Sequence, residues 1–97
     1  MIDINKLQKS LKIKFKDKSL LIKALTHKSA NQEINNEKLE FLGDRVLGLV
    51  IASLIFKKFN DCDEGYLSKQ FSFLVQRDFL YKIALEINLE YYLEFTK

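Results

Sequence analysis

The sequence predicts an all-α fold, and three observations support this prediction. Proline is absent and glycine occurs only 3 times, which favours long helices without breaks. Apolar residues recur at helical spacing through most of the chain. Acidic residues stand before several of these segments, where helix N-caps are expected. The 97 residues are enough for one small domain and no more.

Two short helices are expected first, and a loop follows them. Asp3 caps a helix with an apolar stripe of Ile4, Leu7 and Leu11, and Asp17 caps a second helix that carries Leu20, Leu21, Ile22, Ala24 and Leu25. The polar segment 27–36 lacks helical periodicity and is predicted to be a loop. His27, the only histidine, is interpreted as a structural residue rather than a proton-transfer group.

The longest predicted helix covers residues 36–59 and ends near Asn60. It is apolar on nearly every side, which is typical of a buried helix. At about 100° per residue, Glu37, Glu40 and Asp44 occupy an arc of about 60° on this helix. Carboxylates on a buried helix are costly unless they are paired or bind a metal ion. This conflict is the main functional clue in the sequence.

A simpler explanation exists for part of this acidic stripe. Glu37 and Glu40 lie in the first turns, where they can be solvated and favoured by the positive helix N-terminus. Asp44 lies two turns in, beyond the reach of that effect. Its neighbour Arg45 points about 100° away around the helix, so it is not expected to neutralise Asp44.

Two further helices and an aromatic terminal segment complete the expected elements. Asp63 or its neighbour caps a helix that carries Leu67, Phe71, Leu74 and Val75. Another helix is expected over residues 78–87. The terminal cluster forms part of the core or, in an incomplete domain, surface left uncovered; it comprises Leu89, Tyr91, Tyr92, Leu93 and Phe95.

Charge is distributed unevenly along the chain. Residues 1–30 hold eight lysines and two acidic residues, a balance of +6, whereas the whole chain has a net charge of +3. A lysine-rich first third suits a polyanion, although lysines also commonly solvate exposed helix faces. A single cysteine, Cys62, favours a reducing cytoplasm. No signal peptide or membrane span is expected, because the longest apolar stretch, residues 46–56, is too short.

Three ordered motifs resemble those of the ribonuclease III family. Residues 37–47, EKLEFLGDRVL, resemble its signature E-R-L-E-F-L-G-D-x-V-L. Residues 25–29, LTHKS, are similar to its L-T-H-x-S segment, and residues 63–68, DEGYLS, to its D-E-G-x-L-S segment. The resemblance implies a helical ribonuclease III endonuclease-domain fold that is incomplete at its C-terminal side, with residues 1–97 forming a partial catalytic domain.

The resemblance also implies an activity and its residues. The family comprises divalent-metal-dependent endonucleases that hydrolyse double-stranded RNA in RNA processing, including ribosomal RNA maturation, and that act as homodimers. Glu40 and Asp44 match its catalytic and metal-binding acids. Glu37 and Glu64 are expected to be secondary acids of the active site. Phe41 is interpreted as a dimer contact or a core residue. For Glu64, stabilisation of the helix N-terminus is the simpler role. Carboxylates without thiols suit Mg²⁺, or Mn²⁺, better than Zn²⁺, and no small-molecule cofactor is expected.

Several departures from the family pattern limit this prediction. A second acidic motif, G-D-x-x-E-A, is absent, since Gly43–Asp44 is the only Gly-Asp pair, and no double-stranded RNA-binding domain follows. Arg45 and Phe71 stand where the family usually has a small or apolar residue and a basic residue, respectively. The chain is therefore expected to be a fragment with little activity alone. The alternative is a non-catalytic ribonuclease III-like module that dimerises or binds RNA.

Overall fold

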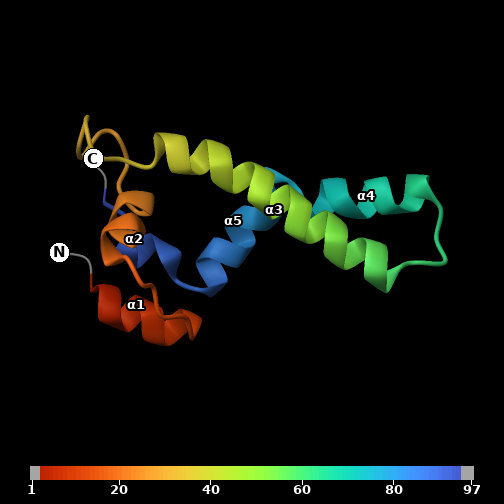
Figure 1. The fold of residues 1–97 in the computed structure, drawn as a ribbon, viewed down its shortest axis with the longest axis horizontal. Helices are drawn as coiled ribbons and strands as arrows, with labels where there is room; N and C mark the ends of the chain where they lie inside the picture. Colours follow the sequence, from red (N-terminus) through yellow and green to blue (C-terminus); the bar gives the residue numbers. More distant parts are fainter. Residues whose placement is uncertain (1–2, 95–97) are drawn as a thin grey trace. The chain divides into compact units, whose positions relative to one another are not determined.

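The computed structural model describes residues 3–94, and helices make up most of this range (Figure 1). The elements are α1 (Ile4–Leu11), α2 (Lys18–Ala24), α3 (Glu37–Lys58), α4 (Glu64–Val75), α5 (Arg77–Glu86) and the 3-10 helix η1 (Leu89–Tyr92). The prediction of an all-α fold is confirmed. Each predicted helix is present, and the segment 27–36 is a loop as expected.

The contacts between residues divide the chain into two units. The first unit joins residues up to Glu40 with residues from Ala84 onward, and the second unit is Phe41–Ile83. Helices α3 and α5 each contribute to both units. The first unit is therefore discontinuous in sequence, because the whole second unit is inserted between its two parts.

The first two helices begin where predicted because aspartates cap them. Asp3 accepts a hydrogen bond from the backbone N–H of Lys6 at 3.0 Å, and Asp17 accepts one from that of Ser19 at 3.0 Å. The Ser19 hydroxyl also donates a hydrogen bond to Asp17. The bonds from the Ser19 hydroxyl and the Ser19 N–H together lower the pKa of the Asp17 carboxyl. Helix α1 ends at Lys12, whose φ of 58° is left-handed.

The core of the first unit forms around α1 and α2. Its buried residues are Leu7, Leu21, Leu25 and Tyr92, and Ile4, Leu11, Phe15 and Leu89 pack against them. The side chain of Leu7 has an exposed fraction of 0%. Tyr92 reaches this core because a parallel bridge joins Thr26 to Glu94. In this bridge the His27 N–H donates to the Glu94 carbonyl at 2.7 Å.

The terminal aromatic cluster is divided between core and surface. Tyr92 is buried and Leu89 packs on the core, whereas Tyr91 is exposed to 77%. The core interpretation is thus correct for Tyr92 and Leu89, whereas Tyr91 lies at the surface of the described chain. Phe95, which was also assigned to it, lies outside the described residues.

The second unit is organised around α3 and α4. Asp63 caps α4 as predicted, because it accepts the Tyr66 N–H at 2.9 Å. The rings of Phe59 and Tyr66 meet edge to face, with centroids 5.2 Å apart. The Phe71 ring of α4 lies near Gly48 on α3, where a Cβ would be 3.6 Å from the ring, an ordinary van der Waals contact.

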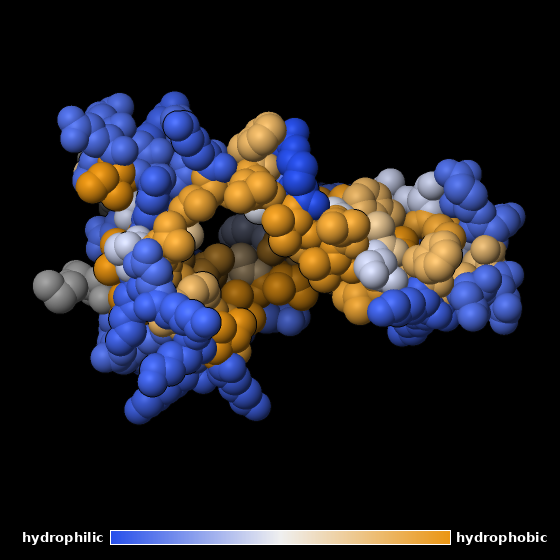
Figure 2. Space-filling view, viewed as in Figure 1, coloured by the Kyte–Doolittle hydropathy of each residue, from blue (hydrophilic) through white to orange (hydrophobic). Residues whose placement is uncertain are grey.

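The prediction that α3 is buried is wrong for the described chain. Ile55 is its only buried residue. Leu49 is exposed to 73%, and Figure 2 shows apolar side chains at the surface along α3. The exposed apolar residues of this helix are Phe41, Leu42, Val46, Leu49, Val50, Leu54 and Phe56. The pattern indicated correctly that α3 is apolar all round, but contacts with α4 cover only the side near Gly48 and Ile55.

These exposed residues do not amount to a membrane span. Across residues 3–94, every helix is either too short or not apolar enough to cross a bilayer.

Candidate active site

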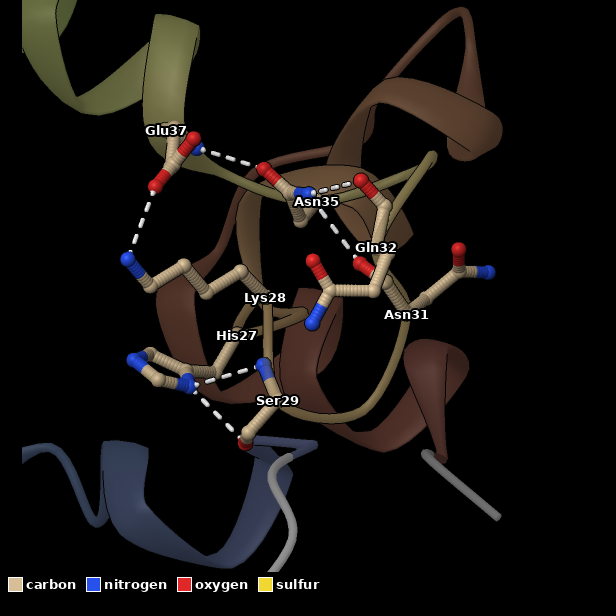
Figure 3. A network of polar contacts seen from close by, with 7 residues as sticks. All are labelled: His27, Lys28, Ser29, Asn31, Gln32, Asn35 and Glu37. Atoms are coloured by element: carbon tan, nitrogen blue, oxygen red, sulfur yellow. Dashed lines mark hydrogen bonds and ion pairs between the residues drawn. The ribbon is translucent and has the colours of Figure 1, made fainter.

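The loop before α3 is built around the buried side chain of Asn35 (Figure 3). Its Nδ2 donates to the carbonyl oxygens of Asn31 and Gln32 at 3.0 and 3.1 Å. Its Oδ1 accepts the backbone N–H of Glu37 at 3.1 Å, so Asn35 satisfies one of the free N–H groups at the start of α3. Sequence reasoning missed this residue, although an asparagine just before a periodic segment is a helix-start signal.

A second set of hydrogen bonds ties the same loop to α2. The Asn36 N–H donates to the Thr26 carbonyl at 2.9 Å, and the Asn31 carboxamide oxygen accepts from Glu33 and Ile34. The Thr26 hydroxyl donates to the Ile22 carbonyl at 2.7 Å. Within the first unit, the N-terminal end of α3 is thus held in a defined position relative to α2.

His27 has the structural role that was predicted for it. Its Nδ1 accepts the Ser29 N–H at 3.1 Å and lies 2.8 Å from the Ser29 hydroxyl (Figure 3). Because Nδ1 accepts this bond, the neutral ring carries its proton on Nε2. The imidazole therefore belongs to a local turn.

Glu37 is the one acid of the predicted stripe with a basic partner. The Lys28 ammonium lies 3.4 Å from its carboxylate, and both side chains are exposed (Figure 3). An exposed pair of this kind contributes at most about 1 kcal/mol. The solvated interpretation of Glu37 therefore fits the structure.

Glu40 and Asp44 lie one helical turn apart on α3, so their side chains share one side of the helix. Both are exposed, so the argument that burial makes these carboxylates costly does not apply to the described chain. Among residues 3–94, neither carboxylate has an ion-pair partner within 4.0 Å. The result is a pair of unneutralised carboxylates that face solvent from one continuous helix.

The Glu40 and Asp44 carboxylates match the ligand preference of a hard divalent metal ion. Carboxylate oxygens are the ligands that Mg²⁺ prefers, and proteins often supply only one or two of them, with waters and substrate phosphates completing the coordination. Within the described range, no three His, Cys, Asp or Glu residues group closely enough to hold an ion. Glu40 and Asp44 are therefore donors of the right kind, but they do not form a complete cage in this range.

Glu64 is the first residue of α4, whereas Glu40 and Asp44 lie on α3. The Glu64 carboxylate accepts the Ser68 hydroxyl at 3.0 Å within α4. It lines a mainly apolar cavity of about 420 Å³ with Ala52, Ile55, Phe56, Leu67, Ser68, Phe71 and Ser72. At about 1.5 Å per residue, Ala52 is about 12 Å further along α3 than Asp44.

Phe41 and Arg45 form one exposed group beside the acids. The ring of Phe41 is 63% exposed, so Phe41 is not a core residue of the described chain. The Arg45 guanidinium lies 4.0 Å from the ring centroid and donates to the Phe41 carbonyl at 3.2 Å. Arg45 is thus accommodated on the surface, while Phe71, the other departure from the family pattern, packs against Gly48.

Comparison with known proteins gives a consistent match. The family model described as Ribonuclease-III-like matches residues 17–97. Ribonuclease 3 of Pelagibacter ubique is 51% identical over 88 residues, which are 91% of this chain and 40% of the relative. Ribonuclease 3 of Helicobacter acinonychis is 53% identical over 87 residues, 90% of this chain and 37% of the relative.

Solved structures agree with these relatives. The nuclease domain of ribonuclease III from Campylobacter jejuni superposes with a TM-score of 0.91 at 49% identity, covering 97% of this chain and 66% of that chain. That structure was described for flexibility in the region involved in its dimer formation. A second structure of the same domain, at 2.2 Å resolution, gives a TM-score of 0.90 and covers 65% of that chain.

The extent of these matches defines what they establish. The chain spans about 40% of the length of the curated relatives and about 65% of the solved nuclease domain. The match of the family model extends over most of the chain, and the identities are close to 50%. The chain therefore belongs to the ribonuclease III family.

Proposed function

We propose that this chain is part of the nuclease domain of an endonuclease that hydrolyses phosphodiester bonds in double-stranded RNA. The observation that carries the proposal is the pair Glu40 and Asp44, which lies within the family signature on one side of α3. Both carboxylates face solvent without an ion-pair partner among residues 3–94. Such a pair is available to a cation or to a substrate.

The proposed roles of the acids follow from their surroundings. Glu40 and Asp44 would hold Mg²⁺, or Mn²⁺, through their carboxylate oxygens. When bound, such an ion activates a water molecule and stabilises charge on the leaving oxygen. Asn35 fixes the first turn of α3 and so limits the positions open to the Glu40 carboxylate. Glu37, paired with Lys28, and Glu64, at the start of α4, are proposed as secondary acids.

The exposed apolar side of α3 supports a homodimer. Seven large apolar residues of this helix are exposed, which is unusual for the surface of a monomer. A second copy of the chain would cover such a surface, and Phe41 is the proposed contact nearest to the acids. The Campylobacter jejuni relative also has a region involved in dimer formation.

Double-stranded RNA is the proposed substrate, with RNA processing, including ribosomal RNA maturation, as the proposed role. Proteins recognise such duplexes mainly by their shape, phosphates and 2′-hydroxyl groups. A reducing cytoplasm is the proposed compartment, since Cys62 is exposed and free.

The decisive experiment is a chimera in which this chain replaces the matching part of the Campylobacter jejuni nuclease domain. The purified chimera is incubated with long, end-labelled double-stranded RNA and Mg²⁺, and cleavage is followed on denaturing gels. We expect the chimera to cut, and Asp44→Asn to lower the rate by about 100-fold or more, as for loss of a group that stabilises developing charge. The 97-residue chain alone is expected to cut weakly or not at all.

Asp61→Asn is the matched control, because it removes the same charge from the exposed turn between α3 and α4. It should leave the cleavage rate nearly unchanged. A folded, dimeric chimera that does not cut would contradict the proposed activity. Equal rates for the chimera and its Asp44→Asn variant would contradict the assignment of Asp44.

One observation favours a second candidate function, a non-catalytic module that dimerises or binds RNA. No cluster of three potential metal ligands occurs among residues 3–94. If this alternative is correct, the chimera will dimerise and bind double-stranded RNA without cutting it.

A further inference from the structure

The first unit contains an open hollow, and four of the seven residues that line it are lysines. Its volume is about 550 Å³. It is lined by Asn5, Gln8, Lys9, Lys12, Ile13, Lys14 and Lys18, and we refer to it as the lysine hollow. Its four lysines come from the end of α1, the following loop and the start of α2. Figure 2 shows the hydrophilic surface over this part of the first unit.

A buried glutamine shapes the lysine hollow. The Gln8 side-chain oxygen accepts the Phe15 N–H at 2.8 Å, and the Gln8 carbonyl accepts the Ile13 N–H at 3.1 Å. Gln8 is 8% exposed, so these bonds are shielded from water. They fold the loop back onto α1, which brings Lys12 and Lys14 to the same hollow as Lys9.

Among residues 3–94, no carboxylate forms an ion pair within 4.0 Å with these four lysines. The nearby Asp3 and Asp17 accept hydrogen bonds at the starts of α1 and α2. In the part of the chain that the structure describes, the one ion pair within 4.0 Å joins Lys28 and Glu37. The lysine hollow therefore presents uncompensated positive charge to solvent.

Local stability does not account for two of the four lysines. Lys18 is the first residue of α2, where a positive charge opposes the helix dipole. Lys12 has a left-handed backbone, a position where glycine or asparagine is usual. Lys9 differs, because a cation in the last turn of α1 is favourable. Helix and turn preferences therefore do not explain why lysine stands at positions 12 and 18.

The same unit indicates which polyanion the hollow fits. A helix that binds a membrane surface needs a free apolar face. In α1 that face is occupied, because Leu7 is fully buried and Ile4 and Leu11 pack on the core. Ile13 is the one exposed large apolar residue that lines the hollow, and the apolar face of α1 is covered, so the lysine ammonium groups suit the phosphates of a nucleic acid better than a membrane surface.

We propose that the lysine hollow is a binding site for the phosphate backbone of double-stranded RNA, in addition to the acids of α3. This inference rests on the proposed function for its choice of RNA. It adds a contact that positions the duplex and has no part in bond cleavage. Binding at the hollow depends on charge and is independent of base sequence.

The test measures binding without cleavage. The full 97-residue chain is titrated into fluorescein-labelled double-stranded RNA in EDTA, and fluorescence anisotropy is recorded from 50 to 200 mM salt. The hollow variant carries Lys9→Gln, Lys12→Gln, Lys14→Gln and Lys18→Gln. We expect it to bind about tenfold more weakly or worse, with the slope of log K against log salt reduced by about three to four.

The matched control removes the same charge from the second unit through Lys57→Gln, Lys58→Gln, Lys69→Gln and Lys82→Gln. It should bind markedly better than the hollow variant. A charge-preserving variant with arginine at the four hollow positions should bind like the parent, and circular dichroism verifies that each variant is folded. If the hollow variant is unfolded, the pair Lys12→Gln and Lys14→Gln replaces it, with a slope reduced by about two, and the pair Lys57→Gln and Lys58→Gln becomes the control.

Three results would overturn the proposal. They are absence of RNA binding by the parent, equal losses in the hollow and control variants, and hollow-dependent binding to phosphatidylserine vesicles that equals or exceeds binding to RNA. Because EDTA excludes metal-dependent cleavage, this test is separate from that of the proposed activity. A chimera that binds RNA through the hollow but does not cut it contradicts the proposed activity alone. A chimera that cuts RNA and binds it equally well with the four hollow lysines replaced contradicts this inference alone.

Discussion

The first unit and helix α3 use similar apolar residues to opposite effect. Leu7 in α1 is completely buried, whereas Leu49 in α3 is 73% exposed. Both lie in helices with apolar residues at regular spacing. The first unit supplies residues from α2 and η1 that cover Leu7, but the described chain supplies little for α3 beyond α4.

An apolar pattern therefore shows which side chains favour burial, but it does not show which segment of the protein covers them. In α1 the apolar residues form one stripe, and segments of the same unit cover it. In α3 they surround the helix, so one neighbouring helix cannot cover them all. A surface of this kind is typical of an interface.

Truncation of Leu7 and Leu49 is the most direct test of this contrast in burial. Leu7→Ala should lower the free energy of unfolding by about 2–5 kcal/mol, because it removes buried methyl groups and leaves a cavity. Leu49→Ala should change it by less than about 0.5 kcal/mol, because the side chain already contacts water. Urea unfolding followed by circular dichroism, at concentrations where the chain is monomeric, measures both values.

A large loss for Leu49→Ala in the monomer would show that α3 is covered in solution. In that case the contrast between the two regions would be wrong. If the loss appears only at higher concentration, with a midpoint that rises with concentration, self-association covers the helix.

The start of α3 offers a second, smaller test. Asn35→Ala should lower the free energy of unfolding by about 1–2 kcal/mol, because it removes the cap on Glu37 and the bonds to Asn31 and Gln32. Asn60→Ala, at an exposed position after α3, is the control and should have little effect. Equal effects of the two changes would show that the loop does not depend on Asn35. Thermal unfolding gives both values.

The smallest effect concerns the charge of the caps. The hydrogen bonds from Ser19 lower the pKa of Asp17 in the folded state, so ionised Asp17 stabilises the fold above the unfolded pKa. This contribution begins to decrease as pH falls below the unfolded pKa, about 4. It is lost once the pH has fallen through the lower pKa of the folded state. Asp17→Asn should flatten this part of the stability curve, as measured by urea unfolding at several acidic pH values.

Asp61→Asn is a suitable control for this titration, since Asp61 is exposed and caps no helix. An unchanged pH dependence in Asp17→Asn would contradict the role given to the cap. The start of α3 should not contribute to this titration through its cap, because Asn35 is uncharged.

Much of the helical framework could be predicted because its signals are local. Asp3, Asp17 and Asp63 cap the helices that their positions indicated. The spacing that places Glu40 and Asp44 on one side of α3 follows from helical geometry alone. Their roles stay a prediction, since the described structure contains no complete metal site.

The features that sequence reasoning missed depend on contacts between distant residues. The exposure of α3 depends on which segments cover it, and periodicity does not carry that information. The cavity that Glu64 lines together with Ala52 depends on how α4 packs on α3, and a motif does not show that packing. The burial of Asn35 depends on the path of the whole loop, although its place before α3 was a usable signal.

The bridge between Thr26 and Glu94 has a consequence for the order of folding. It joins two residues separated by the entire second unit, so closing it has a large entropic cost that only late contacts repay. During synthesis, α1 and α2 emerge early but must wait for Tyr92 before their core is complete. Helix α3 emerges in that interval with its apolar side chains uncovered, so we expect the nascent chain to be exposed to chaperone binding and aggregation before folding is complete.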